Sequence, residues 1–315
     1  SSTRPSQSLS TPSHDPSFAA GLPALQLSKP ELSSFLREGA RGGGEGARWN
    51  RVRGAFVVAQ VALSLLLLVG AALLFRSLHE LLGVDVGFEP RGILTMEYRL
   101  PNNKYPEEAA QAEIHHRIVE ELRAVPGVQS VALVRGLPFS GNFSSVAATF
   151  PDRSPSPPGQ EARVMFDPVT PDYFTTLGIR FIQGRLFDDR DRLATPRVLI
   201  VNETMARTFW PDQSAIGKSV ALAQWDRPGT VVGVVADARL SRLDEKPAPH
   251  VYAPFAQHPW LFATVAIRTR LEPMSLVEPV TRAIWKADPD QPTWKIRTLE
   301  SLVERRLGIA LPNQV

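Results

Sequence analysis

The feature that most constrains this chain is a stretch of 22 residues, 54–75, that carries no charged side chain and reads GAFVVAQVALSLLLLVGAALLF. As an α-helix it would be about 33 Å long, which is enough to cross a bilayer hydrocarbon core of about 30 Å. A helix buried in a soluble core normally carries a polar stripe, yet only Gln60 and Ser64 are strongly polar here. The stretch therefore predicts a transmembrane helix.

Charge is divided unevenly around this span. The chain has 35 Lys and Arg against 32 Asp and Glu, and residues 1–75 alone hold 7 basic and 4 acidic side chains, the whole excess of +3. Four arginines closely precede the span and one closely follows it: Arg41, Arg48, Arg51, Arg53 and then Arg76. Because positive charge is retained on the cytoplasmic side, we expect a cytoplasmic N-terminus and an extracytoplasmic part over 76–315.

Composition excludes several classes of function. The chain has no cysteine, which rules out disulfide scaffolds, thiol nucleophiles and cysteine zinc sites. A net charge of +3 over 315 residues is low for a protein that binds nucleic acid, so no nucleic-acid partner is expected.

The segment before the span divides into two pieces. Residues 1–27 are rich in Ser, Pro and Thr and are expected to be a disordered cytoplasmic lead-in. Within 28–53, the spacing of Ser28 and Glu31 is typical of a helix capping box, and a Gly-rich joint follows at 39–46. We expect a short cytoplasmic helix there, followed by a flexible connection to the span.

The part after the span predicts an α+β fold. Two β-α-β units, over 91–136 and 261–300, pair into one split, ferredoxin-like layer, and a mostly β subdomain is inserted over 161–257. The units rest on strands 93–100, 128–134, 262–268 and 292–298 and helices 106–125 and 276–285. The insert rests on strands 163–167, 179–183, 197–201, 219–223 and 230–235, with a helix at 203–209 that Asn202 caps.

Three motifs suggest chemistry, and each has a simpler interpretation. The string Gly217-Lys218-Ser219 resembles the end of a phosphate-binding loop, but that motif needs a glycine five residues earlier, where Asp212 stands, so a turn is favoured.

His115 and His116, with Glu113, could suggest a metal, but adjacent helical residues point about 100° apart, so a solvated helix face is favoured. The run Asp188–Asp191 is interpreted as a solvated loop, because it lacks the spaced oxygen ligands of a calcium loop. We therefore expect no catalytic residue, no cofactor-binding residue and no metal site, and hence no enzyme.

Within the span, five residues are candidates for transmembrane packing and coupling: the small or polar residues Gly54, Gln60, Ser64 and Gly70, and Phe75 at its end. The amide of Gln60 could bond to a neighbouring helix or contact a substrate, and the neighbouring helix is the simpler interpretation.

Several long strings then carry a resemblance to a known family. RGAFVVAQVALSLLLLVGAALL at 53–74 resembles the first transmembrane helix of MacB/FtsX-like ABC transporter permeases, and is most similar to the second half of the duplicated permeases of the acidobacterial type. VDVGFEPRGILTMEYRLP at 84–101 is similar to the beginning of the family's periplasmic core domain. Further strings match in the family's order at 169–191, 198–222, 230–244, 249–257 and 288–307. The resemblance extends over roughly residues 30–310.

The resemblance implies a permease subunit of a bacterial plasma (inner) membrane transporter, and a fragment of a longer permease, because the family has further helices after this domain. It also implies that ATP is bound and hydrolysed by a separate cytoplasmic ATPase, with no cofactor on this chain. The family couples that hydrolysis mechanically (mechanotransmission) to efflux or other extracytoplasmic work.

The resemblance further implies a set of partners. They are membrane lipid, a cytoplasmic ABC ATPase contacted near Glu31–Glu38, other permease helices or a second permease copy, and a periplasmic adaptor. A candidate partner surface lies on the insert at Tyr173, Phe174, Gly178 and Trp210, although the large apolar residues there also suit a core.

The alternative function is a single-span sensor or scaffold whose ectodomain binds a ligand or partner. Its cytoplasmic tail would have to dock a signalling protein, and the residues before the span contain no kinase or DNA-binding motif. The transporter interpretation is therefore favoured.

Overall fold

The computed structural model describes residues 45–82, 86–153, 161–240 and 245–307, and the chain divides into two compact units, Ser1–Leu74 and Phe75–Val315. The predicted disordered lead-in and the predicted short helix near Glu31 lie outside the described residues, as does most of the Gly-rich joint. The two units are described separately below.

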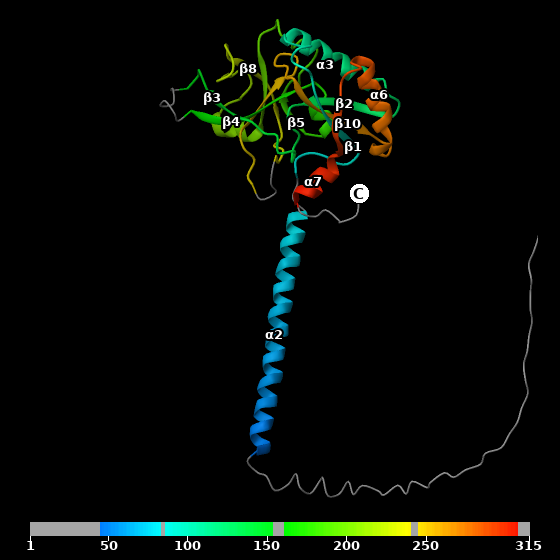
Figure 1. Ribbon diagram of the computed structural model, residues 1–315. Helices are drawn as coiled ribbons and strands as arrows, with labels where there is room; N and C mark the ends of the chain where they lie inside the picture. Colours follow the sequence, from blue (N-terminus) through cyan, green and yellow to red (C-terminus); the bar gives the residue numbers. More distant parts are fainter. Residues whose placement is uncertain (1–44, 83–85, 154–160, 241–244, 308–315) are drawn as a thin grey trace, which may run out of the picture. The chain divides into compact units, whose positions relative to one another are not determined.

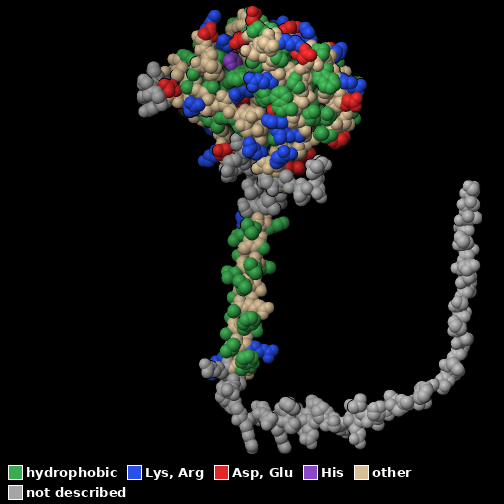
Figure 2. All heavy atoms as spheres, viewed as in Figure 1, with side chains coloured by type: hydrophobic (Ala, Val, Ile, Leu, Met, Phe, Trp, Pro, Cys, Tyr) green, Lys and Arg blue, Asp and Glu red, His purple; other side chains and the backbone are tan. Residues whose placement is uncertain are grey.

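The first unit contains most of helix α2 (Glu45–Leu82), which encloses the predicted span (Figure 1). Within Trp49–Arg76, the most apolar window of 18 residues has a mean hydropathy of 2.5, and none of that window is buried by the rest of the protein. Among the described residues it is the one helix long and apolar enough to cross a membrane. Figure 2 shows hydrophobic side chains along this helix, whereas on the visible face of the second unit acidic and basic side chains are interspersed with hydrophobic ones.

The second unit is built on an eleven-stranded sheet with the strand order β11-β1-β10-β2-β4-β3-β7-β8-β6-β9, and β5 pairs with β8 off this path. In chain order the elements of this unit are β1 (Ile93–Arg99), α3 (Glu108–Arg123), β2 (Val128–Val134), β3 (Ser145–Thr149), β4 (Ala162–Val169), α4 (Tyr173–Leu177), β5 (Phe181–Gly184), β6 (Val198–Asn202), α5 (Glu203–Phe209), β7 (Ser219–Leu222), β8 (Gly229–Val235), β9 (His250–Pro254), β10 (Phe262–Thr269), a 3-10 turn (Pro273–Leu276), α6 (Val277–Ala287), β11 (Thr293–Thr298) and α7 (Leu299–Leu307).

The two predicted β-α-β units come together in one layer. Neighbouring strands along β11-β1-β10-β2 are all antiparallel, and α3 and α6 lie side by side (Figure 1). Alternate residues of β1 face these helices, so Leu94, Met96 and Tyr98 share one buried core with Ile118 of α3 and Ile284 of α6. The apolar face of the strands, which repeats every two residues, thus packs against the apolar faces of the helices, which repeat every 3.6 residues, in a single core.

The predicted insert runs from β4 to β9 and continues the same sheet. Within the sheet, the insert pairs with the first layer at one residue pair, Val134 of β2 with Val169 of β4. The strand that leads into the insert, β4, and the strand that leaves it, β9, are parallel neighbours. The predicted cap of α5 is confirmed, because the Asn202 side-chain oxygen accepts a hydrogen bond from the backbone N–H of Met205 at 3.0 Å.

The sequence reading missed four elements, namely β3, β9, α4 and α7. Strand β9 is buried at every residue and therefore shows no alternation of polar and apolar side chains. Strand β3 reads SVAAT and has only small apolar residues, and α4 is only 5 residues long. These three elements depend on their neighbours more than on a local periodic pattern. Helix α7 does have such a pattern, because its buried residues Leu299, Leu302 and Val303 recur at helical spacing.

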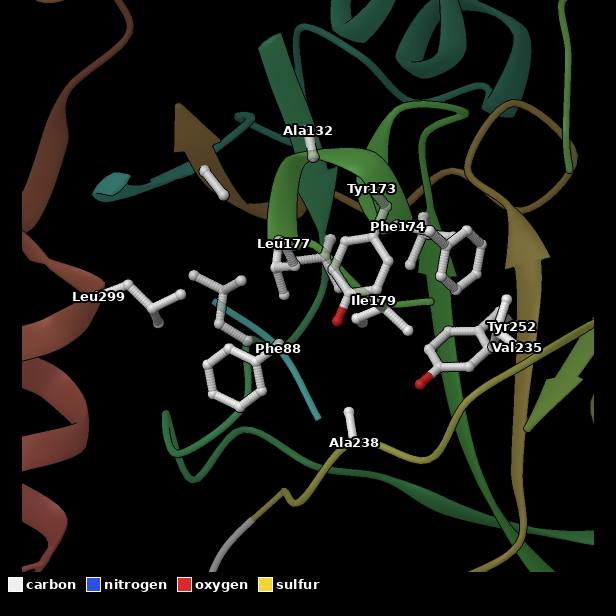
Figure 3. Close-up of a cluster of buried hydrophobic side chains, with 14 of the residues drawn as sticks. Phe88, Ala132, Tyr173, Phe174, Leu177, Ile179, Val235, Ala238, Tyr252 and Leu299 are labelled. Carbon is white, nitrogen blue, oxygen red and sulfur yellow. The ribbon is translucent and has the colours of Figure 1, made fainter. Parts of the chain in front are cut away.

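Three clusters of buried apolar side chains stabilise the domain. One lies beneath α3 and α6, a second lies inside the insert around Trp210 and Trp225, and the third joins the insert to the first layer. Figure 3 shows part of the third cluster, where Tyr173, Phe174 and Tyr252 pack near Phe88.

Candidate functional site

The transmembrane candidate positions lie on α2, where Gln60 and Ser64 are one turn apart. They share one face with Val57, Val61 and Leu68 and are exposed. A Cβ atom at Gly54 or Gly70 would meet nothing within 4 Å. Small residues at such positions let another helix approach closely, and an amide in an apolar face can donate and accept across the contact.

The candidate partner surface on the insert is wrong for three of its four residues. Tyr173 is 2% exposed, Phe174 is fully buried and Trp210 is 5% exposed. Tyr173 and Phe174 project from the short helix α4 into the cluster of Figure 3, where the Phe174 ring meets the Tyr252 ring edge-on. Aromatic side chains of this size gain more from burial in the core than they would from a solvated surface.

The fourth residue, Gly178, is exposed and has a backbone role. It is the C-cap of α4, with a φ of 71° in the left-handed region. A side chain is disfavoured in this conformation, so glycine ends the helix at lower cost than other residues.

The interpretation of His115 as part of a solvated face is also wrong. His115 is 2% exposed, and both ring nitrogens are engaged, Nδ1 with the Tyr98 hydroxyl at 2.6 Å and Nε2 with the Trp260 carbonyl at 2.7 Å. A carbonyl only accepts, so Nε2 carries the proton and Nδ1 accepts from Tyr98. Burial lowers the pKa of His115 to about 4 and raises the pKa of Tyr98.

His116, by contrast, is exposed, so the two histidines face different surroundings. Over the part of the chain that the structure describes, no three His, Asp or Glu side chains gather closely enough to hold a metal ion.

The acidic run at Asp188–Asp191 is solvated at Asp189 and Arg190, as expected, but the loop is also held by ion pairs, and Asp191 is buried. Arg185 grips the Asp191 carboxylate with two hydrogen bonds, at 2.8 and 2.7 Å, and Asp191 is 5% exposed. Asp188 is held by the guanidinium of Arg190, which lowers the pKa of the Asp188 carboxyl. A fork of this kind is more directional than a simple ion pair, and it holds the loop in one conformation.

The predicted turn at Gly217-Lys218-Ser219 is confirmed. Gly217 has a φ of 81°, Ser219 begins β7, and the Lys218 ammonium donates to the Gln213 side chain at 2.6 Å. The string follows a turn and leads into a strand, whereas a phosphate loop leads from a strand into a helix.

The structure also contains a cleft that was not predicted from the sequence. It has a volume of about 570 Å³ and lies between one face of α3 and the loop 188–194, and its lining includes Phe255, the residue that follows β9. The α3 wall presents Ala109, Ala112 and Glu113. No local signal could have revealed it, because the two walls lie about 75 residues apart in the chain and meet only in the tertiary structure.

Comparison with known proteins places most of the chain in one family. The sequence model described as the MacB-like periplasmic core domain matches residues 55–287, a range that includes most of the predicted span. Among curated proteins, none matches the chain.

Two solved structures are similar to this chain. The periplasmic region of MacB from Actinobacillus actinomycetemcomitans is 16% identical, with 74% of this chain and 99% of that chain covered and a TM-score of 0.46. The extracellular domain of the noncanonic ABC-type transporter YknZ from Gram-positive bacteria is also 16% identical, with 64% and 100% covered and a TM-score of 0.41.

Proposed function

The chain belongs to the MacB-like periplasmic core domain family, a family of ABC transporter permeases, and we propose that it is a permease subunit that couples ATP hydrolysis on a separate ATPase to extracytoplasmic work. The observation that carries this proposal is the extent of the family match, which includes both apolar helix and β-rich domain. The chain is a membrane protein with an extracytoplasmic domain, since it joins a periplasmic domain to one helix of membrane-spanning length.

The proposal divides the work along the chain. Residues 1–27 and 28–53 lie in the cytoplasm, 54–75 transmit motion through the inner membrane, and 76–315 act outside it, on efflux or another process. The side chains of Gln60 and Ser64 on the exposed face of α2 contact other permease helices or a second permease copy. Nucleotide is bound by the ATPase and not by this chain, and a periplasmic adaptor joins the domain.

The proposal also covers the internal division of the domain. The layer formed by 91–136 and 261–300 is a split ferredoxin-like fold, and 161–257 is a subdomain inserted into it. The order β11-β1-β10-β2 with antiparallel neighbours supports this assignment, because it places each β-α-β pair of strands on either side of a strand from the other pair.

The ATPase partner is tested by crosslinking in the native membrane. A photoreactive amino acid at Glu38 is expected to capture a protein with a nucleotide-binding loop, and the yield should change when ATP is exchanged for ADP. The matched control carries the same amino acid at Arg270, in the domain, and should capture no ATPase. If Glu38 captures no nucleotide-binding protein, the sensor or scaffold alternative replaces the transporter.

The orientation is tested by labelling, because the chain has no cysteine of its own. Ser8→Cys and Glu278→Cys each introduce one thiol, on the two sides of the span. In intact spheroplasts, a membrane-impermeant maleimide should label Glu278→Cys and should reach Ser8→Cys only after lysis. The opposite pattern would invert the proposed topology.

A further inference from the structure

We propose that the cleft between α3 and the loop 188–194 is a binding site for a small organic cation that carries an apolar body. The assignment does not depend on the transporter function, because it concerns only the extracytoplasmic domain. It rests on the volume of the cleft, its apolar lining and the pairing of the charges around it.

The cleft has the size and lining of a small-molecule site. Its volume of about 570 Å³ lies within the range of roughly 300–1,000 Å³ that is typical of ligand pockets. Ala109 and Ala112 of α3 supply accessible apolar surface on one wall, and Leu193 and Ala194 supply it on the opposite wall, whereas Val119 and Phe255 are buried beneath the cleft. Leu193 is 40% exposed, so part of this apolar surface is available to a ligand.

Most charges around the cleft are already neutralised within the domain. Arg123 is paired with Asp172 and Glu120, at 2.6 Å in each case. Asp191 is held by the Arg185 fork described above, and Asp188 is held by Arg190 at 2.7 Å. These charged groups form the walls of the cleft, and because each is already paired, they would interact only weakly with a charged ligand.

Two lining carboxylates remain, one on each wall. Over the described residues, Glu113 of α3 and Asp189 of the loop have no salt-bridge partner, and both are exposed. Arg192 is the one lining guanidinium left without a carboxylate there, and its Nε donates to the backbone carbonyl of Asp189 at 2.6 Å. The charge that is left unpaired is therefore net negative.

A cation with an apolar body satisfies both features of the cleft. Its ammonium group would form charge-assisted hydrogen bonds with Glu113 and Asp189, while its apolar part would cover Ala109, Ala112 and Leu193. Among the described residues, an anion of the same shape would meet two unpaired carboxylates against the one unpaired guanidinium of Arg192, so the net interaction would be repulsive, and a neutral analogue would gain only the apolar contact. The predicted order of affinity is therefore cation, then neutral compound, then anion.

Three probes with one shared body test this order. 4-Phenylbutylamine, 4-phenylbutanol and 4-phenylbutyrate differ only in the head group, and their binding is measured by titration calorimetry on the full chain in lipid nanodiscs, with empty nanodiscs subtracted. The amine is expected to bind about tenfold more tightly than the alcohol, because one charge-assisted contact contributes about that factor. The preference should weaken as salt is added.

Variants locate the site. Glu113→Gln and Asp189→Asn should each lower amine affinity by about tenfold without changing alcohol affinity. Ala112→Trp fills the cleft and should abolish binding of both. Glu108→Gln, on the same helix but outside the lining, is the matched control and should bind like the parent chain.

Three results would overturn the proposal. The first is equal affinity for the amine and the butyrate. The second is amine binding that neither Glu113→Gln nor Asp189→Asn weakens, which would place the site elsewhere. The third is no detectable binding of the amine by the parent chain.

Discussion

The carboxylate of Asp167 and the imidazole of His250 face each other with Oδ2 and Nε2 3.0 Å apart, and each side chain is 2% exposed. Asp167 lies on β4, which leads into the insert, and His250 lies on β9, which leaves it, so the pair bonds the two strands on either side of the insert. Arg135, which follows β2, approaches the other oxygen of Asp167 at 3.6 Å. His250 also stacks on Tyr252, with ring centroids 4.0 Å apart.

Replacing His250 should therefore destabilise the domain strongly. His250→Ala leaves a buried carboxylate without its closest partner, which typically costs about 3–5 kcal/mol. The free energy of unfolding is measured by urea titration with tryptophan fluorescence, on the chain in detergent. His116→Ala, an exposed histidine on α3, is the control and should change this value by less than about 0.5 kcal/mol. If His250→Ala and His116→Ala lowered the free energy of unfolding equally, the pair of Asp167 and His250 would not stabilise the domain.

His115 should make the domain sensitive to acid. Its pKa in the folded protein is about 4 and its ordinary value is 6.5, so the unfolded chain binds the extra proton first as the pH falls. Stability contributed by neutral His115 is complete above pH 6.5 and is lost progressively towards pH 4. The loss amounts to roughly 3 kcal/mol.

The measurement is the free energy of unfolding at several pH values between 7 and 4 (a range set by these two pKa values). His115→Gln cannot titrate, so its profile should be flatter than that of the parent chain, although its stability at pH 7 should be lower because Tyr98 and the Trp260 carbonyl lose their fitted partner. His116→Gln should keep the parent slope. If the unfolding free energy of His115→Gln fell with pH as steeply as that of the parent chain, His115 would not be the cause of the acid sensitivity.

Gly178→Ala should destabilise α4 for a backbone reason. The residue has a φ of 71°, and a Cβ there would lie 3.3 Å from the Cβ of Glu89. The left-handed conformation costs a residue with a side chain about 1–2 kcal/mol. Gly178→Asn tests the cause, because asparagine adopts the left-handed conformation more readily than alanine. Its free energy of unfolding, measured by urea titration, should therefore fall less than that of Gly178→Ala. Equal losses would point to steric contact and not to backbone conformation.

Two arginines in the middle of α2 should prevent stable membrane insertion. Leu66 and Leu67 are near the centre of the apolar segment and are 71% and 67% exposed. Each arginine at the centre of a membrane helix costs about 2.5–3.5 kcal/mol on insertion scales. The Leu66→Arg, Leu67→Arg double variant should be extracted from membranes by alkaline carbonate. The matched Leu66→Phe, Leu67→Phe variant should stay in the pellet, and retention of both would argue against a membrane span.

Much of the local structure could be predicted from the sequence. The length and lack of charge of 54–75 were sufficient for an apolar helix, and the spacing of Ile114, Ile118 and Leu122 was sufficient for α3. The Asn202 cap and the turn at Gly217 depend on residues within about four positions of one another, so the local sequence contains the whole interaction.

The candidate site was harder to predict, because exposure depends on what packs from elsewhere. His115 and His116 are adjacent, yet only His115 is buried, since Phe255 and the Trp260 carbonyl reach it from about 140 residues further along the chain. From the sequence, Tyr173 and Phe174 are compatible with either a partner surface or a core. In the structure they are buried, because Tyr252 of β9 packs against both rings.

The sequence by itself therefore determined the apolar span, the helices with a strong period and the family to which the chain belongs, because composition, periodicity and motif order are local properties. Only the tertiary structure decided which polar groups are buried, how β4 and β9 pair, and that α3 and the loop 188–194 enclose a cleft. These features join residues far apart in the chain, and the free energy of burying or pairing them arises only when folding brings them together.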